Sequence, residues 1–409
     1  TAPLIINAGT SNITLSNPNA NIGGGVSYTG NTFYNVAFSS NAITTSSFYG
    51  NNTFNALTFT TRASSGVSNV ILYGDQTVNG TLTISGQSSV NRYFVQSNIT
   101  GTTRTLTVAT VAALTDVDFR DITVAGASAT WSGTQLGDCG GNTGITFPAA
   151  KTVYWNGTTG GAWTGNFWAA SSGGAVSAAN FPLAQDTAII DDTGLSTGRS
   201  ITGGVGYNLK TLTSTKTNAW TLSTRPIVYG DVTLTPSMTA TAFGPTFAGR
   251  STQNLTTAVN TIASSVSMTI AGYNASVKLM DGLFVGNISI VSGGFDTNNQ
   301  TISSWAGLTP ATTNTGPFSL TLGSSAITFS GSIFGSLTTA PPMTVSAGTS
   351  TITLTTASAS FGFAGQTLTW YNVTKNIAST TSNIYGVNTF NNLTLTSPTV
   401  SAVTNLVLS

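Results

Sequence analysis

The chain has 409 residues, of which 40% are hydrophobic and only 6% are charged, and its net charge is +1. It is long enough to bury a large core, but about a quarter of the residues in ordinary globular proteins are charged, so ion pairs contribute little here. The scattered charge predicts no nucleic-acid-binding surface, and no apolar run is long enough to predict membrane insertion.

The first residues belong to a passage that returns near the other end of the chain. Residues 9–15 read Gly-Thr-Ser-Asn-Ile-Thr-Leu, and residues 348–354 read Gly-Thr-Ser-Thr-Ile-Thr-Leu. Residues 49–59 are likewise matched by residues 385–395. Such self-similarity indicates a repetitive protein, and we expect the chain to be one length of a larger assembly or polypeptide.

A shorter period lies inside the long one. Tyr49-Gly50 returns as Tyr73-Gly74, and the passage at 323–329 returns in related form at 348–354. Alternating apolar and hydroxyl residues between these motifs predict short strands. The spacing favours a parallel β-solenoid of about 17 rungs, each of about 24 residues, over the alternative of a string of β-sandwich domains.

The alternation also predicts which side chains point into the solenoid, because successive residues of a strand face opposite sides. The expected inward residues are Ile13, Leu15, Leu57, Phe59, Leu82, Ile84, Ile288, Ile290, Leu320, Leu322, Ile352, Leu354, Leu393 and Leu395.

A Trp/Gly-rich segment interrupts this rhythm. Trp155, Trp163 and Trp168 fall within fourteen positions and are surrounded by glycines. We expect them to pack in one local cluster; the alternative is an exposed aromatic platform that binds carbohydrate. The predicted organisation is therefore a solenoid segment at 1–148, a Trp/Gly-rich module at 149–200 and a second solenoid segment at 201–409.

The composition restricts catalysis. The chain has no histidine and no glutamate, which excludes histidine triads, histidine zinc sites and glutamate-based glycosidase pairs within it. We predict no enzyme activity and no cofactor. Two aspartate groups remain as candidates, for structural roles first and otherwise for calcium or for attack on a polysaccharide: Asp116, Asp118 and Asp121, and Asp186, Asp191 and Asp192.

Several motifs together resemble a known kind of protein. They are the Gly-[Thr/Ser]-Ser-x-Ile-Thr-[Leu/Phe] passages, Asn-Thr-Phe-Asn-Asn-Leu-Thr-Leu at 388–395, Gly-Gly-Phe-Asp-Thr-Asn at 293–298, and the stretch 154–186. They resemble the long Gly/Ser/Thr/Asn-rich repeat proteins of uncultured tailed phages, regarded as tail-fibre or virion-surface adhesins. The resemblance implies a rigid adhesive segment on a virion surface and transfers no site residue.

The same sequence features are compatible with two other functions. One is a secreted bacterial adhesin or extracellular filament protein, and the other is a polysaccharide depolymerase with two Asp carboxylates in a groove. The partners we expect are a host-surface glycan and further copies of the chain in a homo-oligomer. Residues 2–6 and 403–408 are both strand-like, so we expect flanking chain or another copy to cover both ends.

Overall fold

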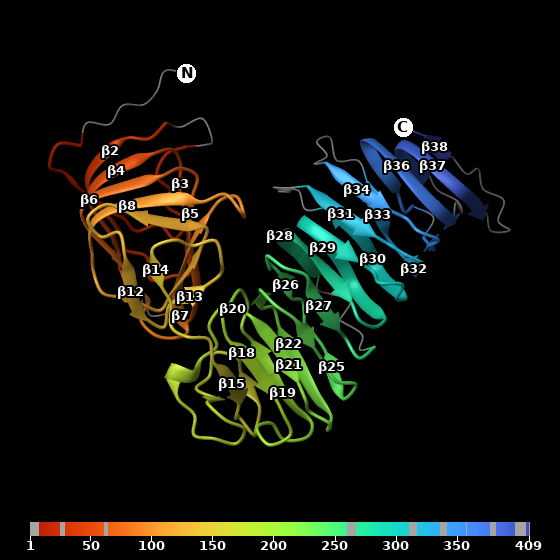
Figure 1. Ribbon diagram of the computed structural model, residues 1–409, viewed down its shortest axis with the longest axis horizontal. Helices are drawn as coiled ribbons and strands as arrows, with labels where there is room; N and C mark the ends of the chain where they lie inside the picture. The colour runs from red at the N-terminus through yellow and green to blue at the C-terminus, as the bar shows by residue number, and fades with distance from the viewer. Residues whose placement is uncertain are drawn as a thin grey trace. The chain divides into compact units, whose positions relative to one another are not determined.

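The computed structural model describes residues 8–24, 29–60, 64–259, 267–310, 317–335, 342–356, 358–376, 382–396 and 406–408. The protein is all-β, with 57% of its residues in strands, and stacked parallel coils form a β-solenoid of about 15 turns spaced about 23 residues apart (Figure 1). The predicted solenoid is confirmed, and the β-sandwich alternative is wrong because successive strands pair in parallel rather than antiparallel. Residues 2–6 and 403–405, which belong to the two strand-like ends, lie outside the described residues.

The chain divides into two compact units, which are described separately below. Unit 1 comprises residues 1–156, 164–188 and 204–210, and unit 2 comprises residues 157–163, 189–203 and 211–409. The Trp/Gly-rich segment expected at 149–200 is shared between the two units instead of forming a third.

Unit 1 contains three parallel sheets (Figure 1), and its later strands include an antiparallel pair. The first sheet holds β1 (Asn12–Leu15), β2 (Thr32–Phe38), β4 (Asn52–Phe59), β6 (Gln76–Ile84), β8 (Arg104–Val111) and β11 (Ile122–Ala125). The second holds β3 (Thr45–Phe48), β5 (Gly66–Leu72), β7 (Asn91–Ser97), β10 (Val117–Arg120) and β13 (Gly137–Asp138). The third holds β9 (Leu114–Thr115), β12 (Trp131–Thr134) and β14 (Ile145–Thr146), and β15 (Thr152–Trp155) pairs with β17 (Trp168–Ala169). Unit 1 also contains β20 (Asn208–Leu209), and the boundary between the units falls inside β18 (Thr187–Ile190).

Stacked aromatic rings fill the first turns of unit 1. Phe38 and Phe59 occupy the same position in neighbouring turns, and their ring centroids lie 4.9 Å apart with nearly parallel planes. Phe33 stacks in the same way on Phe54, at 5.5 Å. At these positions the parallel register places a phenylalanine opposite a phenylalanine of the next turn. The strands are thus stabilised by a continuous apolar column that one turn could not bury alone.

Unit 2 contains a short parallel sheet and a long one. The short sheet holds β16 (Gly161–Ala162), β19 (Arg199–Gly203), β22 (Trp220–Thr224) and β25 (Met238–Ala240). The long one includes β21 (Thr211–Ser214), β23 (Ile227–Val228), β24 (Val232–Thr233), β26 (Thr246–Phe247), β27 (Gln253–Thr256), β28 (Ser267–Leu279), β29 (Leu283–Asp296), β30 (Ile302–Pro310), β31 (Phe318–Thr321), β32 (Ala326–Phe329), β33 (Ser332–Gly335), β34 (Met343–Ser346), β35 (Thr351–Leu354), β36 (Phe361–Asn376), β37 (Ser382–Thr396) and β38 (Leu406–Leu408).

The sequence repeat in unit 2 corresponds to direct stacking. Strand β32 pairs in parallel with β35, so that Ile327 lies opposite Ile352 and Phe329 opposite Leu354. The two Gly-[Ser/Thr]-Ser-x-Ile-Thr passages therefore occupy the same place in consecutive turns. The interval between these two passages is thus the length of one turn at this point of the solenoid.

Most of the predicted inward residues are buried. Leu57, Phe59, Leu82, Ile84, Ile288, Ile290, Leu320, Leu322, Ile352 and Leu354 are all at most 4% exposed. Ile13 and Leu15 are only partly buried, and they lie on β1, which is the edge strand of its sheet among the described residues. The prediction is wrong for Leu393 and Leu395 on β37, which are each 39% exposed.

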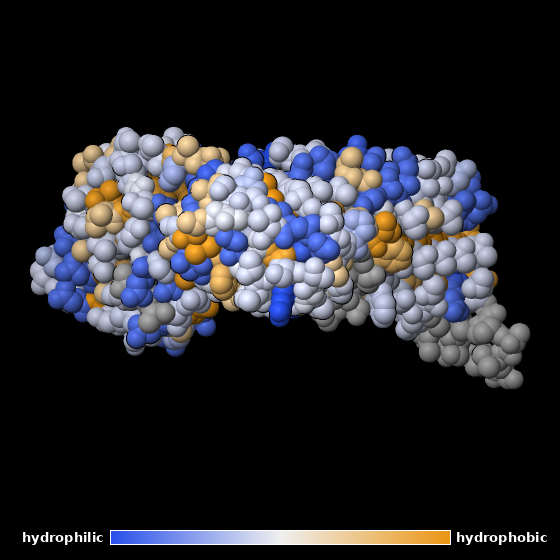
Figure 2. Space-filling model, turned by 90° about the horizontal axis from the view of Figure 1, so that it is seen from below, coloured by the Kyte–Doolittle hydropathy of each residue, from blue (hydrophilic) through white to orange (hydrophobic). Residues whose placement is uncertain are grey.

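The outer surface is built from small polar residues. The face in Figure 2 is mostly white and pale blue, with scattered orange patches, as the alternation of Thr, Ser and Asn with inward apolar residues requires. One 3-10 turn, Ala178–Asn180, is capped by Ser177, and the described segments contain no α-helix. Within those segments no helix has the length and apolar character to cross a membrane.

Candidate functional site

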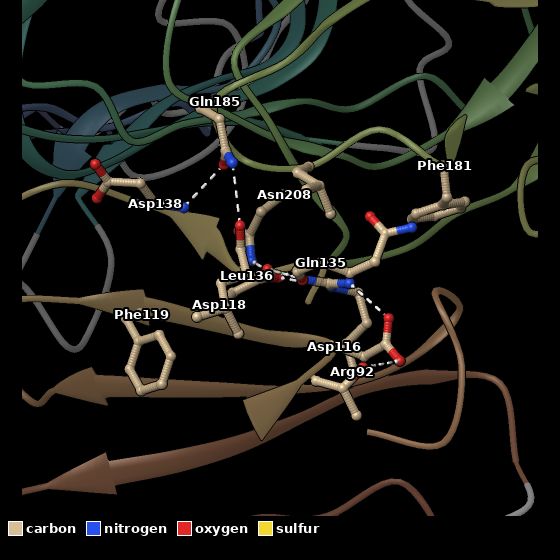
Figure 3. Close-up of polar contacts among 12 residues, drawn as sticks. Arg92, Asp116, Asp118, Phe119, Gln135, Leu136, Asp138, Phe181, Gln185 and Asn208 are labelled. Carbon is tan, nitrogen blue, oxygen red and sulfur yellow. Dashed lines mark hydrogen bonds and ion pairs between the residues drawn. The ribbon is translucent and has the colours of Figure 1, made fainter. Parts of the chain in front are cut away.

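A buried cluster of charges lies in unit 1, on one face of the sheet that contains β7 and β10 (Figure 3). Arg92 of β7 donates from Nη2 to Oδ1 of Asp118 on β10 at 2.5 Å, and its Nη1 lies 3.5 Å from Oδ1 of Asp116. All three side chains are at most 8% exposed. Because a buried charge without a partner is costly, the guanidinium and the two carboxylates depend on one another.

Two further groups complete the cluster. Arg92 also donates to the backbone oxygen of Gln135 at 2.7 Å, and Nδ2 of Asn208 donates to Oδ2 of Asp118 at 2.8 Å. Burial alone would lower the pKa of Arg92, but the attraction of Asp118 raises it. Burial raises the pKa of Asp116, and the charge of Arg92 only partly offsets that effect. Arg92 is therefore a permanent cation that holds segments distant in sequence together.

Gln185 makes a second polar connection beside this cluster (Figure 3). Its Oε1 accepts from the backbone N–H of Asp138 at 2.9 Å, and its Nε2 donates to the carbonyl of Leu136 at 3.0 Å. The side chain therefore satisfies the edge of β13, which would otherwise expose unpaired backbone groups. Together with Asn208, it attaches residues 183–188 and 204–210 of unit 1 to earlier turns of the same unit.

The predicted aspartate group at 186–192 does not form one site. Asp186 belongs to unit 1, where its carboxylate accepts from the backbone N–H of Leu183 and forms an ion pair with Lys151. Asp191 and Asp192 belong to unit 2. Asp191 accepts from the backbone N–H of Gly194 at 2.8 Å, which closes a turn.

Asp192 is the most heavily hydrogen-bonded carboxylate of unit 2. It accepts from Oγ1 of Thr217 at 2.5 Å, from Nζ of Lys216 at 2.9 Å and from both nitrogens of Asn218. These bonds, led by that of Thr217, lower the pKa of Asp192 well below its usual range. The ammonium of Lys216 is fully buried and also donates to the carbonyl of Leu195 at 2.7 Å, so this pair fixes a turn.

These placements favour structural roles for both aspartate groups. Asp121, the third member of the other group, accepts from the backbone N–H of Gly101 at 3.0 Å. In the part of the chain that the structure describes, no three Asp or Cys side chains gather as a metal site would require. Asp116 and Asp118 of that group both form ion pairs with Arg92 and are almost fully buried.

The three predicted tryptophans are buried, with exposed fractions of 0% for Trp155, 0% for Trp163 and 1% for Trp168. Trp155 and Trp168 pair across β15 and β17, and their rings meet edge to face at 5.4 Å. Trp163 belongs to unit 2, where its backbone N–H donates to Thr202 at 2.7 Å. The indoles pack inside the protein, so the exposed aromatic platform expected as an alternative is not present.

Side-chain amides at the turns between strands, which we call corner amides, hydrogen-bond the backbone of those turns. The sequence alone did not reveal this role. Nε2 of Gln76 donates to the carbonyls of Gly50 and Gly74, both at 2.8 Å, and its Oε1 accepts from Nδ2 of Asn52 at 2.9 Å. Asn52 also donates to the carbonyl of Tyr49 at 2.9 Å. The amide two residues after Tyr49-Gly50 and after Tyr73-Gly74 thus satisfies the backbone of the turn, and Asn388 does the same after Tyr385-Gly386. This recurring spacing was the available signal.

A surface pocket of about 160 Å³ opens in unit 1. One wall is the turn that precedes β7, and the other is formed by residues 164–181. It is lined by Ser88, Ser89, Val90, Thr164, Gly165, Asn166, Trp168, Ser177, Ala178 and Phe181. Sequence reasoning found only Trp168 among these residues, because the two walls are far apart along the chain.

Comparisons with known proteins add no information on function, so the function is argued from the fold and from these sites. No protein-family model, no curated protein and no solved structure matches this chain.

Proposed function

We propose that the chain is a rigid structural and adhesive segment of a fibre on a virion surface, and that it has no catalytic role. The observation that carries this proposal is the parallel stacking of turns within each unit, as in Phe38 on Phe59 of unit 1 and Ile327 opposite Ile352 of unit 2. Parallel turns held by backbone ladders, aromatic stacks and corner amides resist bending because deformation would break many contacts together. Few charges take part, so stiffness should depend little on salt.

The resemblance to phage fibre proteins favours a virion over a cell surface as the place of this segment. A secreted bacterial adhesin would use the same physics, and immunogold electron microscopy separates the two. Antibodies raised against the purified chain are applied to virus particles and to cells separated from one culture that produces it. Label along fibres of the particles is the expected result. Label on the cell exterior would replace the phage proposal by the adhesin, and label inside cells would refute both.

We further propose that the segment works as a homo-oligomer or beside flanking copies of itself. The exposed leucines of β37, Leu393 and Leu395, supply apolar surface that a partner would cover. Sedimentation equilibrium of the purified chain measures this directly. A mass that is a multiple of 41.7 kDa is expected, whereas a single species at 41.7 kDa over all concentrations would contradict the proposal.

A further inference from the structure

One edge of β37 in unit 2 has no partner strand along most of its length among the described residues. Residues 387–396 pair with β36 on one side, whereas β38 pairs only with residues 382–384. Leu393 lies opposite the buried Val373 of β36, yet Leu393 and Leu395 are each 39% exposed. A strand edge with exposed apolar side chains beside it is a template on which another strand can pair.

Strand β1 in unit 1 carries a matching edge. It pairs with β2 alone among the described residues, and its Ile13 and Leu15 are only partly buried. Its sequence, Asn-Ile-Thr-Leu at 12–15, matches Asn-Leu-Thr-Leu at 392–395 position by position. Neither β1 nor β37 contains a charged residue or a proline, which commonly protect an edge from pairing. Parallel pairing in this register would place apolar side chains on apolar ones and asparagine on asparagine.

Outward asparagines give this match a direction. In unit 1, Nδ2 of Asn55 donates to Oδ1 of Asn35 at 2.9 Å, and Nδ2 of Asn35 donates to Oδ1 of Asn12 at 2.7 Å. In unit 2, Nδ2 of Asn392 donates to Oδ1 of Asn372 at 2.8 Å. Each amide therefore donates to the turn before it. A ladder continued in the same sense takes Oδ1 of Asn392 as the next acceptor and Nδ2 of Asn12 as the next donor.

We propose that residues 392–395 of β37 bind β1 of a second copy of this chain, in parallel, with Leu393 beside Ile13 and Leu395 beside Leu15. The proposal rests on the homo-oligomer of the proposed function and deepens it, because it names the two strands, their register and their direction. The two edges are different surfaces, so copies associate head to tail instead of forming a symmetric dimer. The contact continues both the backbone ladder and the apolar column of the solenoid from one copy into the next.

Disulfide formation between different variants tests the strands and the register. Thr14→Cys and Thr394→Cys each add one thiol, and the native Cys139 is buried. In the proposed register the two new thiols lie on neighbouring strands, with Cα atoms about 4.8 Å apart, which a disulfide can span. Thr328→Cys is the matched control, because Thr328 is an exposed threonine of the same outward column, three turns before Thr394.

Thr14→Cys is isotope-labelled, mixed in equal amounts with unlabelled Thr394→Cys, and oxidised in a glutathione buffer. Mass spectrometry should find a disulfide-linked product that contains one labelled and one unlabelled chain. Neither variant should form a linked dimer alone, and Thr14→Cys should form none with Thr328→Cys. Absence of the mixed product would overturn the proposal, as would linked dimers of Thr394→Cys alone, which indicate a tail-to-tail contact.

Leu393→Lys tests the same interface without added cysteines. It places a charge on an exposed side chain, so the melting temperature should change little, whereas the dissociation constant measured by sedimentation equilibrium should rise at least about tenfold because the charge loses hydration in the contact. Val205→Lys, at another exposed apolar position, should leave this constant unchanged.

An unchanged dissociation constant for Leu393→Lys would also overturn head-to-tail pairing. Oligomers would then persist through another contact, so the homo-oligomer of the proposed function would stand while this interface failed. A single species at 41.7 kDa for the native chain would contradict both. None of these results affects the immunogold experiment, which tests the fibre assignment separately.

Discussion

Arg92 donates from Nη2 to Oδ1 of Asp118 at 2.5 Å, and both side chains are excluded from solvent. Asp118→Ala would remove the nearer of the two carboxylates that pair with the buried guanidinium and leave the more distant Asp116. We expect the free energy of unfolding of unit 1 to fall by about 3–5 kcal/mol, measured by urea denaturation. Asp75→Ala is the control, because Asp75 is exposed and accepts from the backbone N–H of Thr105, and it should cost less than about 1 kcal/mol. Equal costs for both variants would show that the pair is not important for stability.

Inward and outward leucines of the same alternating pattern should respond very differently to a charge. Leu322→Asp buries a carboxylate at a position that is 1% exposed, whereas Leu395 is 39% exposed. The first substitution should lower the free energy of unfolding by at least about 3 kcal/mol, because an unpaired charge cannot keep its hydration there. Leu395→Asp should cost far less in the same urea titration. A mild effect of Leu322→Asp would contradict the placement of this side chain in the core.

The corner amide of Gln76 should contribute measurably to the free energy of unfolding, although it carries no charge. Gln76→Leu keeps a similar volume but removes the Nε2 donor from the carbonyls of Gly50 and Gly74, and Gly50 keeps only the longer bond from Nδ2 of Asn52, at 3.3 Å. We expect a cost of about 1–3 kcal/mol, read from the denaturant midpoint. Gln87→Leu, at an exposed position, is the control and should be nearly neutral. Faster hydrogen exchange confined to residues near the Tyr-Gly turns would accompany the loss.

The burial of Lys375 leads us to predict that the stability of the protein depends on pH. It is fully buried opposite Leu354, its ammonium contacts the carbonyl of Ala359, and burial lowers its pKa. Between this lowered pKa and the ordinary value of 10.5 the unfolded chain binds more protons, so stability should rise with pH in that window.

Lys375→Met should remove this part of the pH dependence and raise the melting temperature at neutral pH, because the variant no longer buries a charge. Lys210→Met, at an exposed site, should leave the pH profile unchanged. Thermal denaturation at neutral pH and near pH 10 measures both effects. If native chain and Lys375→Met showed parallel profiles, the buried amine would not be the cause.

Gly348, which opens the repeat at 348–354, is predicted to be irreplaceable for steric reasons. Gly348 has φ +57°, and a Cβ placed there would lie 2.2 Å from the carbonyl oxygen of Gly323 in the preceding turn. Gly365 also has a positive φ, of +74°, but a Cβ there would meet nothing within 4 Å. Both alanine variants carry a backbone penalty of about 1–2 kcal/mol, and Gly348→Ala should cost clearly more. Similar melting temperatures for the two variants would rule out the close approach between turns.

Local pattern was sufficient to predict the solenoid and most of its core. In a strand the side chains alternate between two faces, so the alternation around Leu82 or Ile288 states which residues face inward without knowledge of their partners. The length of one turn could also be predicted from the sequence, because a motif that lies at the same place in consecutive turns recurs at a spacing equal to the turn length. The pattern failed at Leu393 and Leu395, where burial depends on a neighbouring turn rather than on the strand itself.

Only the tertiary structure decided the polar cluster, the division of the tryptophans and the pocket. In β7 the alternation places Tyr93 and Val95 inward and leaves Arg92 and Phe94 on the outer face, yet these two are buried as well. The outer face is covered because the chain returns to it much later, with Asn208 bonding Asp118 across 90 residues. The pocket likewise requires residues 88–90 to meet residues 164–181. Such contacts depend on where a distant segment docks, whereas alternation and repeat length are local properties that the amino-acid sequence carries by itself.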